Sequence, residues 1–115
     1  SDVYAIANWL NTRIPGRIPE GSICKPPSAE LAPDQVDPFN YDIVSPLVDA
    51  IIQEKKSPSE LIQNGADSDL VYSLYQRIRF NEYKRRQAAP GLRVSSKAFG
   101  LGRRIPIVNH YKGKF

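Results

Sequence analysis

Methionine is absent from this sequence of 115 residues, and cysteine, histidine and tryptophan each occur once. The single cysteine, Cys24, excludes an intrachain disulfide framework, and one Cys with one His cannot form a Cys/His zinc site. No apolar run approaches the roughly 20 residues of a membrane-spanning helix, and no secretory signal opens the chain. We therefore expect no membrane partner and a cytoplasmic location. The lack of methionine, with a helix that begins at once, predicts a piece of a longer protein.

The charged residues are divided unevenly along the chain. Residues 1–76 carry 5 Lys or Arg and 11 Asp or Glu, whereas residues 77–115 carry 11 Lys or Arg and one acid, Glu82. A basic segment of this kind favours a polyanionic partner, such as nucleic acid, a phosphate-bearing ligand or the acidic face of another subunit. A solvated basic tail is the alternative.

Apolar periods and capping residues predict a mainly α structure, a cluster of helices joined by short turns. Asp42 and Asp67 are candidate N-caps, and Ser57-Pro58-Ser59-Glu60 is a capping box. A short strand is predicted near residues 22–25. The predicted helices run from Asp2 to about Thr12, with Val3, Ile6, Ala7 and Leu10 as its apolar stripe; from Ile43 to about Lys55, with Pro46 in its first turn; from Pro58 to Gly65; and from Ser68 to about Arg86.

A proline-rich loop, residues 25–38, separates the first two long helices. Pro26, Pro27 and Pro33 fix φ near −65° and remove three backbone donors, which predicts a stiff, extended segment. Several polar side chains would be presented by it, among them Lys25, Ser28, Glu30 and Asp34. The acids of such a loop most often face solvent, and pairing with Arg or holding a metal are the alternatives.

A second charged stretch, Asn81 to Gln87, ends the longest predicted helix, and an extended basic arm, residues 92–115, follows it. Lys84, Arg85 and Arg86 either complement the helix dipole or bind phosphate or carboxylate. We expect this stretch and the loop at 25–35 to belong to one anion-binding site. No catalytic set and no metal site is complete, because Gly100-Leu101-Gly102 is too short for a phosphate-binding loop and a lone tail histidine excludes a Ser/His/Asp triad.

Three blocks of sequence, in this order, resemble one known family. They are Asp2-Val3-Tyr4-Ala5-Ile6-Ala7; Lys25-Pro-Pro-Ser-Ala-Glu-Leu31 with Pro33-Asp34-Gln35 and Asp37; and Asn81-Glu-Tyr-Lys-Arg-Arg-Gln87 with Ala89-Pro90-Gly91, Ala98-Phe99-Gly100 and Arg103-Arg104-Ile105-Pro106-Ile107. Together they resemble the C-terminal part of the NAD synthetases of the glutamine-dependent type, over nearly the whole chain. The resemblance divides the chain into a helical part, residues 1–91, that includes the substrate loop 25–38, and the arm 92–115.

The resemblance implies a function and a parent fold. Such enzymes convert deamido-NAD to NAD with ATP and Mg²⁺: ATP adenylates the nicotinate carboxylate, and glutamine-derived ammonia then displaces AMP. The fold implied is an α/β parallel-sheet synthetase domain of the ATP-pyrophosphatase superfamily, working as a homo-oligomer. The Ser-Gly-Gly-x-Asp-Ser phosphate loop is not in this chain, so we expect the chain alone to be inactive.

The resemblance also implies roles for individual residues. Lys84 and Tyr83 match a pair that contacts deamido-NAD, and Ser28 matches the loop hydroxyl that lies near the ATP phosphates. Glu30, Asp34 and Lys25 match loop positions without an assigned role. Two other readings compete: a nucleic-acid-binding module built on residues 84–104, which we do not expect, and a purely structural interface segment.

Overall fold

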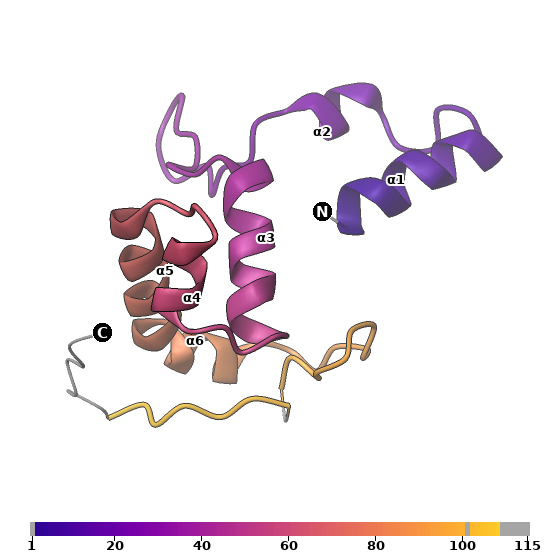
Figure 1. Cartoon of the computed structure of the whole chain (residues 1–115). Coiled ribbons are helices and arrows are strands. Elements are labelled where there is room, and N and C mark those ends of the chain that lie inside the picture. Colours follow the sequence, from indigo (N-terminus) through magenta and orange to yellow (C-terminus); the bar gives the residue numbers. More distant parts are fainter. Residues whose placement is uncertain (1, 101, 109–115) are drawn as a thin grey trace. The chain divides into compact units, whose positions relative to one another are not determined.

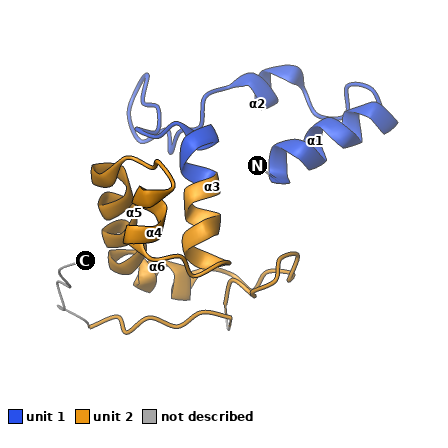
Figure 2. Cartoon of the chain, viewed as in Figure 1, with its two compact units in different colours: residues 1–45 blue, residues 46–115 orange. Residues whose placement is uncertain are grey.

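The computed structural model describes residues 2–100 and 102–108, and within these ranges it contains six helices and no strand (Figure 1). The mainly helical composition predicted from the periodicity is therefore confirmed for the described residues. The chain divides into two compact units, residues 1–45 and 46–115, and the boundary between them falls inside the third helix (Figure 2). The helices are α1 Asp2–Arg13, α2 Glu20–Cys24, α3 Tyr41–Ile52, α4 Pro58–Gln63, α5 Ser68–Phe80 and α6 Glu82–Gln87.

The first unit contains α1, where it was predicted, and α2, where a strand was predicted. Only Ala7 of the predicted apolar stripe of α1 is buried, while Val3 and Ile6 are 77% and 64% exposed. The prediction of a strand near residues 22–25 is wrong, because a short helix follows Pro19. Its first turn is closed by the Ser22 N–H, which donates to the Pro19 carbonyl at 2.9 Å. Lys25 is extended and ends this helix.

Helix α3 begins two residues earlier than predicted, at Tyr41, so Asp42 lies inside it and is not the N-cap. The side-chain oxygen of Asn40 accepts the Asp42 N–H at 3.0 Å, and the Asn40 carbonyl accepts the Val44 N–H at 2.9 Å. Asn40 therefore satisfies the first free donors of the helix. Pro46 is consequently a residue of the helix interior, beyond the first turn, where its missing N–H removes one bond of the helical ladder. The helix ends at Ile52, before Lys55, which adopts a φ of 60°.

The second unit has the small hydrophobic core. Ala50, Leu61 and Val71 are its buried members, from α3, α4 and α5. Leu47, Ile51, Ile62, Ala66 and Tyr75 pack against them. The predicted capping box is confirmed, since the Ser57 hydroxyl accepts the Glu60 N–H and the Glu60 carboxylate accepts the Ser57 N–H at 2.7 Å. The predicted cap of α5 is confirmed as well, with Asp67 accepting the Leu70 N–H at 2.8 Å.

The long helix predicted from Ser68 to Arg86 is interrupted at Asn81. The backbone N–H and the side-chain amide of Asn81 both donate to the Arg77 carbonyl, at 3.0 and 2.8 Å. Short polar side chains compete in this way for backbone acceptors and so favour helix ends. The helix is thus divided into α5 and the six-residue α6, and the basic stretch forms a short element of its own.

Candidate functional site

The proline-rich loop of the first unit turns back on itself and is not extended along its length. The Asp37 N–H donates to the Pro27 carbonyl at 2.8 Å, and the Gln35 side chain accepts the N–H groups of Leu31 and Ala32 at 2.9 and 3.2 Å. The prolines fix φ only at their own positions. The loop reverses where Glu30 and Asp34 adopt left-handed φ values of 52° and 58°.

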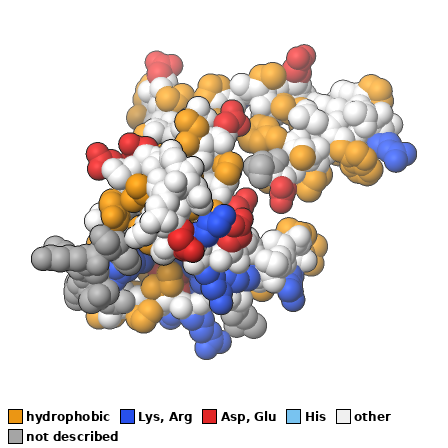
Figure 3. All heavy atoms as spheres, in the orientation of Figure 1, with side chains coloured by type: hydrophobic (Ala, Val, Ile, Leu, Met, Phe, Trp, Pro, Cys, Tyr) orange, Lys and Arg blue, Asp and Glu red, His pale blue; other side chains and the backbone are white. Residues whose placement is uncertain are grey.

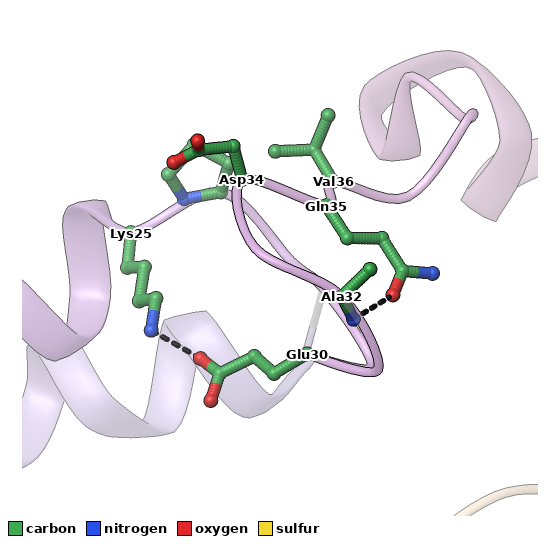
Figure 4. Close-up of a pocket in the computed structure, with 7 residues that line it drawn as sticks. Lys25, Glu30, Ala32, Asp34, Gln35 and Val36 are labelled. Carbon is green, nitrogen blue, oxygen red and sulfur yellow. Dashed lines mark hydrogen bonds and ion pairs between the residues drawn. The ribbon is translucent and has the colours of Figure 1, made fainter.

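The reversal of the loop creates a shallow pocket of about 460 Å³ whose polar lining includes Lys25, Glu30, Asp34 and Gln35. Figure 4 shows the Lys25 ammonium and the Glu30 carboxylate pointing toward each other across it. The hydrogen bond from Lys25 holds the pKa of Glu30 below its ordinary value. Both side chains remain more than 60% exposed, so the pair adds little to stability and can exchange its partner for a ligand.

Ser28 is half-buried at the start of this reversal, and its hydroxyl oxygen accepts the Glu30 N–H at 3.0 Å. The hydroxyl proton remains available for donation to an anion. Asp34, six residues later in the loop, is exposed. Three of the four loop residues named from the sequence, Lys25, Glu30 and Asp34, therefore share one pocket, and Ser28 shapes its backbone.

Helix α6 of the second unit contains a buried carboxylate that the sequence reasoning did not single out. The Glu82 side chain is 1% exposed and accepts both Nε and Nη2 of Arg85, at 2.8 and 2.5 Å. Its Oε1 also accepts Arg86 Nε at 3.2 Å and the Ile105 N–H at 3.3 Å. Arg103 Nη2 lies 3.7 Å from Oε2. We call Glu82, Arg85, Arg86, Arg103 and the Ile105 N–H the Glu82 cluster.

Hydrogen bonds, burial and neighbouring charges shift the pKa values of the Glu82 cluster. The hydrogen bond from Arg85, followed by those from the Ile105 N–H and Arg86, outweighs burial and lowers the pKa of Glu82 from 4.5 to about 2. The same contact raises the pKa of Arg85. Arg103 is shifted the other way, because burial and the Arg85 charge lower its pKa. A signal was present in the sequence: Glu82 is the sole acid after residue 76, with arginines three and four positions later.

The Glu82 cluster also fastens the basic arm to α6. Arg85 donates to the carbonyl oxygens of Phe99, Gly100 and Arg103, the last two at 2.9 and 2.6 Å. Arg86 Nη2 donates to the Ile105 carbonyl at 2.7 Å. Over its described residues the arm therefore contacts α6 of the same unit. Arg85 and Arg86 therefore have structural contacts with the arm, and phosphate binding by either of them stays a prediction.

Tyr83 and Lys84 stand apart from these contacts. Tyr83 is 45% exposed, and Lys84 is exposed as well. Within residues 2–100 and 102–108, the Lys84 ammonium has no hydrogen-bond or ion-pair partner. Figure 3 shows Lys and Arg side chains gathered on the part of the second unit that contains α6 and the arm. Lys84 is thus an exposed cation in a basic region, unpaired among the described residues, and such a position suits a phosphate-bearing ligand.

The loop and the basic stretch lie in different units, residues 1–45 and 46–115. Their expected union in one anion-binding site stays a prediction. None of the helices in the described part of the chain has both the length and the apolar composition of a membrane span. The same residues contain no group of three or more His, Cys, Asp or Glu that could hold a metal ion.

These features define a helical, basic segment with two candidate anion-contacting elements, and comparison with known proteins gives its family. The family model described as NAD synthase matches residues 1–88. Glutamine-dependent NAD(+) synthetases of Synechocystis sp. and Acinetobacter baylyi are 40% and 44% identical, each over 96% of this chain. The chain belongs to the NAD synthase family.

A solved structure supports the same assignment. The glutamine-dependent NAD+ synthetase of Acinetobacter baumannii, in complex with adenosine diphosphate, matches 93% of this chain with a TM-score of 0.58 and 33% identity. The match covers 18% of that structure's chain, and this chain spans 20% and 21% of the Synechocystis and Acinetobacter baylyi relatives. It therefore corresponds to about a fifth of the relatives that it matches.

Proposed function

We propose that this chain is the C-terminal segment of an ATP-dependent carbon–nitrogen ligase that amidates deamido-NAD to NAD. The nicotinate carboxylate attacks the α-phosphorus of ATP and releases pyrophosphate; glutamine-derived ammonia then attacks the acyl adenylate and releases AMP. The similarity to glutamine-dependent synthetases along nearly the entire chain supports this activity. The single structural observation that carries the proposal is the exposed Lys84 ammonium, which is free to meet a dinucleotide phosphate.

Individual roles follow from chemistry. Lys84 is a point charge suited to a phosphate of deamido-NAD, and the neighbouring Tyr83 offers a ring face and a hydroxyl. Ser28 can donate its hydroxyl proton to an ATP phosphate while its oxygen accepts the Glu30 N–H. Lys25 can leave Glu30 to meet the same phosphates. Electrostatic complementarity to the adenylyl group that is transferred and to the pyrophosphate that leaves is the main contribution expected of such residues.

The rest of the proposal concerns the whole protein. It includes a parallel sheet, a homo-oligomeric cytoplasmic enzyme, and use of ATP with Mg²⁺; the relative solved with adenosine diphosphate supports the nucleotide. Mg²⁺ would neutralise phosphate charge in such a reaction. We assign it no ligand in the described part of this chain, which lacks a cluster of acids. The chain alone is expected to be inactive, since it lacks the Ser-Gly-Gly-x-Asp-Ser phosphate loop.

The test is turnover of the full-length protein that carries this sequence. We expect NAD and AMP to form in equal amounts from deamido-NAD, ATP and glutamine, and turnover to require ATP. The release of pyrophosphate without NAD when ammonia and glutamine are withheld would identify the adenylation step. If no NAD forms under any nitrogen source, the proposed function is wrong.

A further inference from the structure

Glu82 is a buried charge that takes no part in the reaction proposed above. Burying a carboxylate is costly unless it is fully paired, and here two guanidinium groups and a backbone N–H donate to it. Such an arrangement marks a position where geometry is tightly held.

Glu82 is the first residue of α6, a helix of only six residues that is separated from α5 at Asn81. A helix this short does not persist through its own backbone bonds, because nucleation is unfavourable. Its orientation is therefore set by tertiary contacts. Besides its contacts with α5, the helix has those of the Glu82 cluster, in which Arg85 and Arg86 reach the arm through the carbonyls of residues 100, 103 and 105.

Of the two substrate candidates, Lys84 lies on the other side of the same helix and Tyr83 lies at its flank. Residues three and four positions apart share a helix face, so Glu82, Arg85 and Arg86 face the arm together. Each residue turns the helix by about 100°, which puts Lys84 about 200° away from Glu82. Accordingly Glu82 is buried while Tyr83 and Lys84 are exposed. One face is bound to the arm, and the opposite face is presented outward.

We propose that Glu82 is a positioning residue for deamido-NAD: by binding the arm to α6, it fixes the direction in which Lys84 and Tyr83 are presented to the dinucleotide. This inference rests on the proposed function, because it assigns Glu82 an effect through Lys84. A change in the direction of the Lys84 side chain weakens the binding of deamido-NAD and leaves the groups that contact the nicotinate carboxylate and the α-phosphate in place. The expected signature is an increased KM for deamido-NAD with a smaller change in kcat.

The experiment is a double-mutant cycle on the full-length enzyme, with Glu82→Gln, Lys84→Ala and the double variant. The Kd for deamido-NAD is measured for each by calorimetry. Glu82→Gln keeps the size of the side chain and removes the charge. We expect it to raise Kd on the order of tenfold in the parent, and less than about twofold in the Lys84→Ala background. Glu54→Gln is the matched control, since Glu54 is an exposed acid of the same unit paired with Lys56 at 2.7 Å, and it should leave Kd unchanged.

The outcomes separate the two proposals. If Lys84→Ala alone leaves Kd unchanged, the proposed role of Lys84 fails, and the positioning inference fails with it. If Lys84→Ala raises Kd but Glu82→Gln raises it equally in both backgrounds, or in neither, the role of Lys84 stands and the positioning inference is overturned.

A variant that removes only the outer part of the cluster guards against misfolding of Glu82→Gln. Arg86→Gln loses the 3.2 Å contact with Glu82 and the contact with the Ile105 carbonyl, while the bidentate Arg85 contact remains. It should raise Kd in the same background-dependent manner, by a smaller factor. Equal rises in the parent and in the Lys84→Ala background would overturn the inference here too.

Discussion

Replacement of Glu82 by glutamine should release the basic arm from α6. One pKa unit corresponds to about 1.36 kcal/mol, so a carboxyl whose pKa falls from 4.5 to about 2 on folding stabilises the folded second unit by at most about 3 kcal/mol at neutral pH. Contacts within α6 and contacts with the arm share this contribution. Because the folded pKa is depressed, this contribution is complete above the unfolded value of 4.5 and is lost as the pH falls toward 2. A neutral side chain at this position removes it at every pH.

Limited proteolysis with trypsin measures this release. Arg103 is held in the Glu82 cluster, whereas Arg93 lies earlier in the arm and bonds only to the nearby carbonyls of Ser95 and Ser96. Where opening is fast relative to cleavage, the cleavage rate follows the population of the open form. Glu82→Gln should therefore accelerate cleavage after Arg103 relative to cleavage after Arg93 in the same digest. The factor should stay well below the roughly 100-fold that about 3 kcal/mol would give, because Arg85 and Arg86 belong to α6 and only the contacts of Arg103 and the Ile105 N–H are lost with the arm. Equal cleavage ratios in the parent and the variant would refute the reasoning.

Three further predictions concern the second unit and the loop. Val71→Ala should lower the free energy of local opening by about 2 kcal/mol, because the side chain is fully buried in the α3–α4–α5 core; protected amides of α5 that exchange at the parent rate would contradict this. Ser57→Ala should destabilise α4 by about 1 kcal/mol because it removes the capping box, and hydrogen exchange of the Glu60 amide should become faster. Asp67→Ala, which removes the N-cap of α5, is the comparison and should leave the exchange of the Glu60 amide closer to the parent rate. Ser28→Ala should raise the KM of the full-length enzyme for ATP and leave that for glutamine unchanged, and an unaltered KM for ATP would remove Ser28 from the nucleotide site.

Local rules predicted the helices well and their ends less well. The capping box at Ser57 and the cap at Asp67 are short-range patterns, and both are present in the structure. The predicted helix from Ser68 to about Arg86 continues through Asn81. The Asn81 side chain instead competes for the Arg77 carbonyl, which the period does not encode. The same limit explains α2, where the helical turn behind Pro19 prevailed over weak strand propensity.

Long-range pairing explains what was missed at the candidate site. The Glu82 cluster joins α6 to residues up to 23 positions later, through a backbone N–H and carbonyl oxygens that no side-chain pattern reveals. Likewise the period of α1 predicted an apolar face correctly but not its exposure, because burial depends on what covers a face. The proline-rich loop itself pointed to Ser28, Lys25, Glu30 and Asp34 before the resemblance did, but the reversal of the loop at Glu30 and Asp34 is visible only in the structure.

Calorimetric titration of deamido-NAD into the full-length enzyme and its Lys84→Ala variant tests the central claim most directly. Arg93→Ala is the matched control, because it removes one positive charge from the same basic third of the chain. We predict that Lys84→Ala loses about 1–3 kcal/mol of binding free energy, the scale of a charge-assisted hydrogen bond, while Arg93→Ala binds like the parent. Equal affinity of Lys84→Ala and the parent would contradict the assignment of α6 as a substrate-binding element.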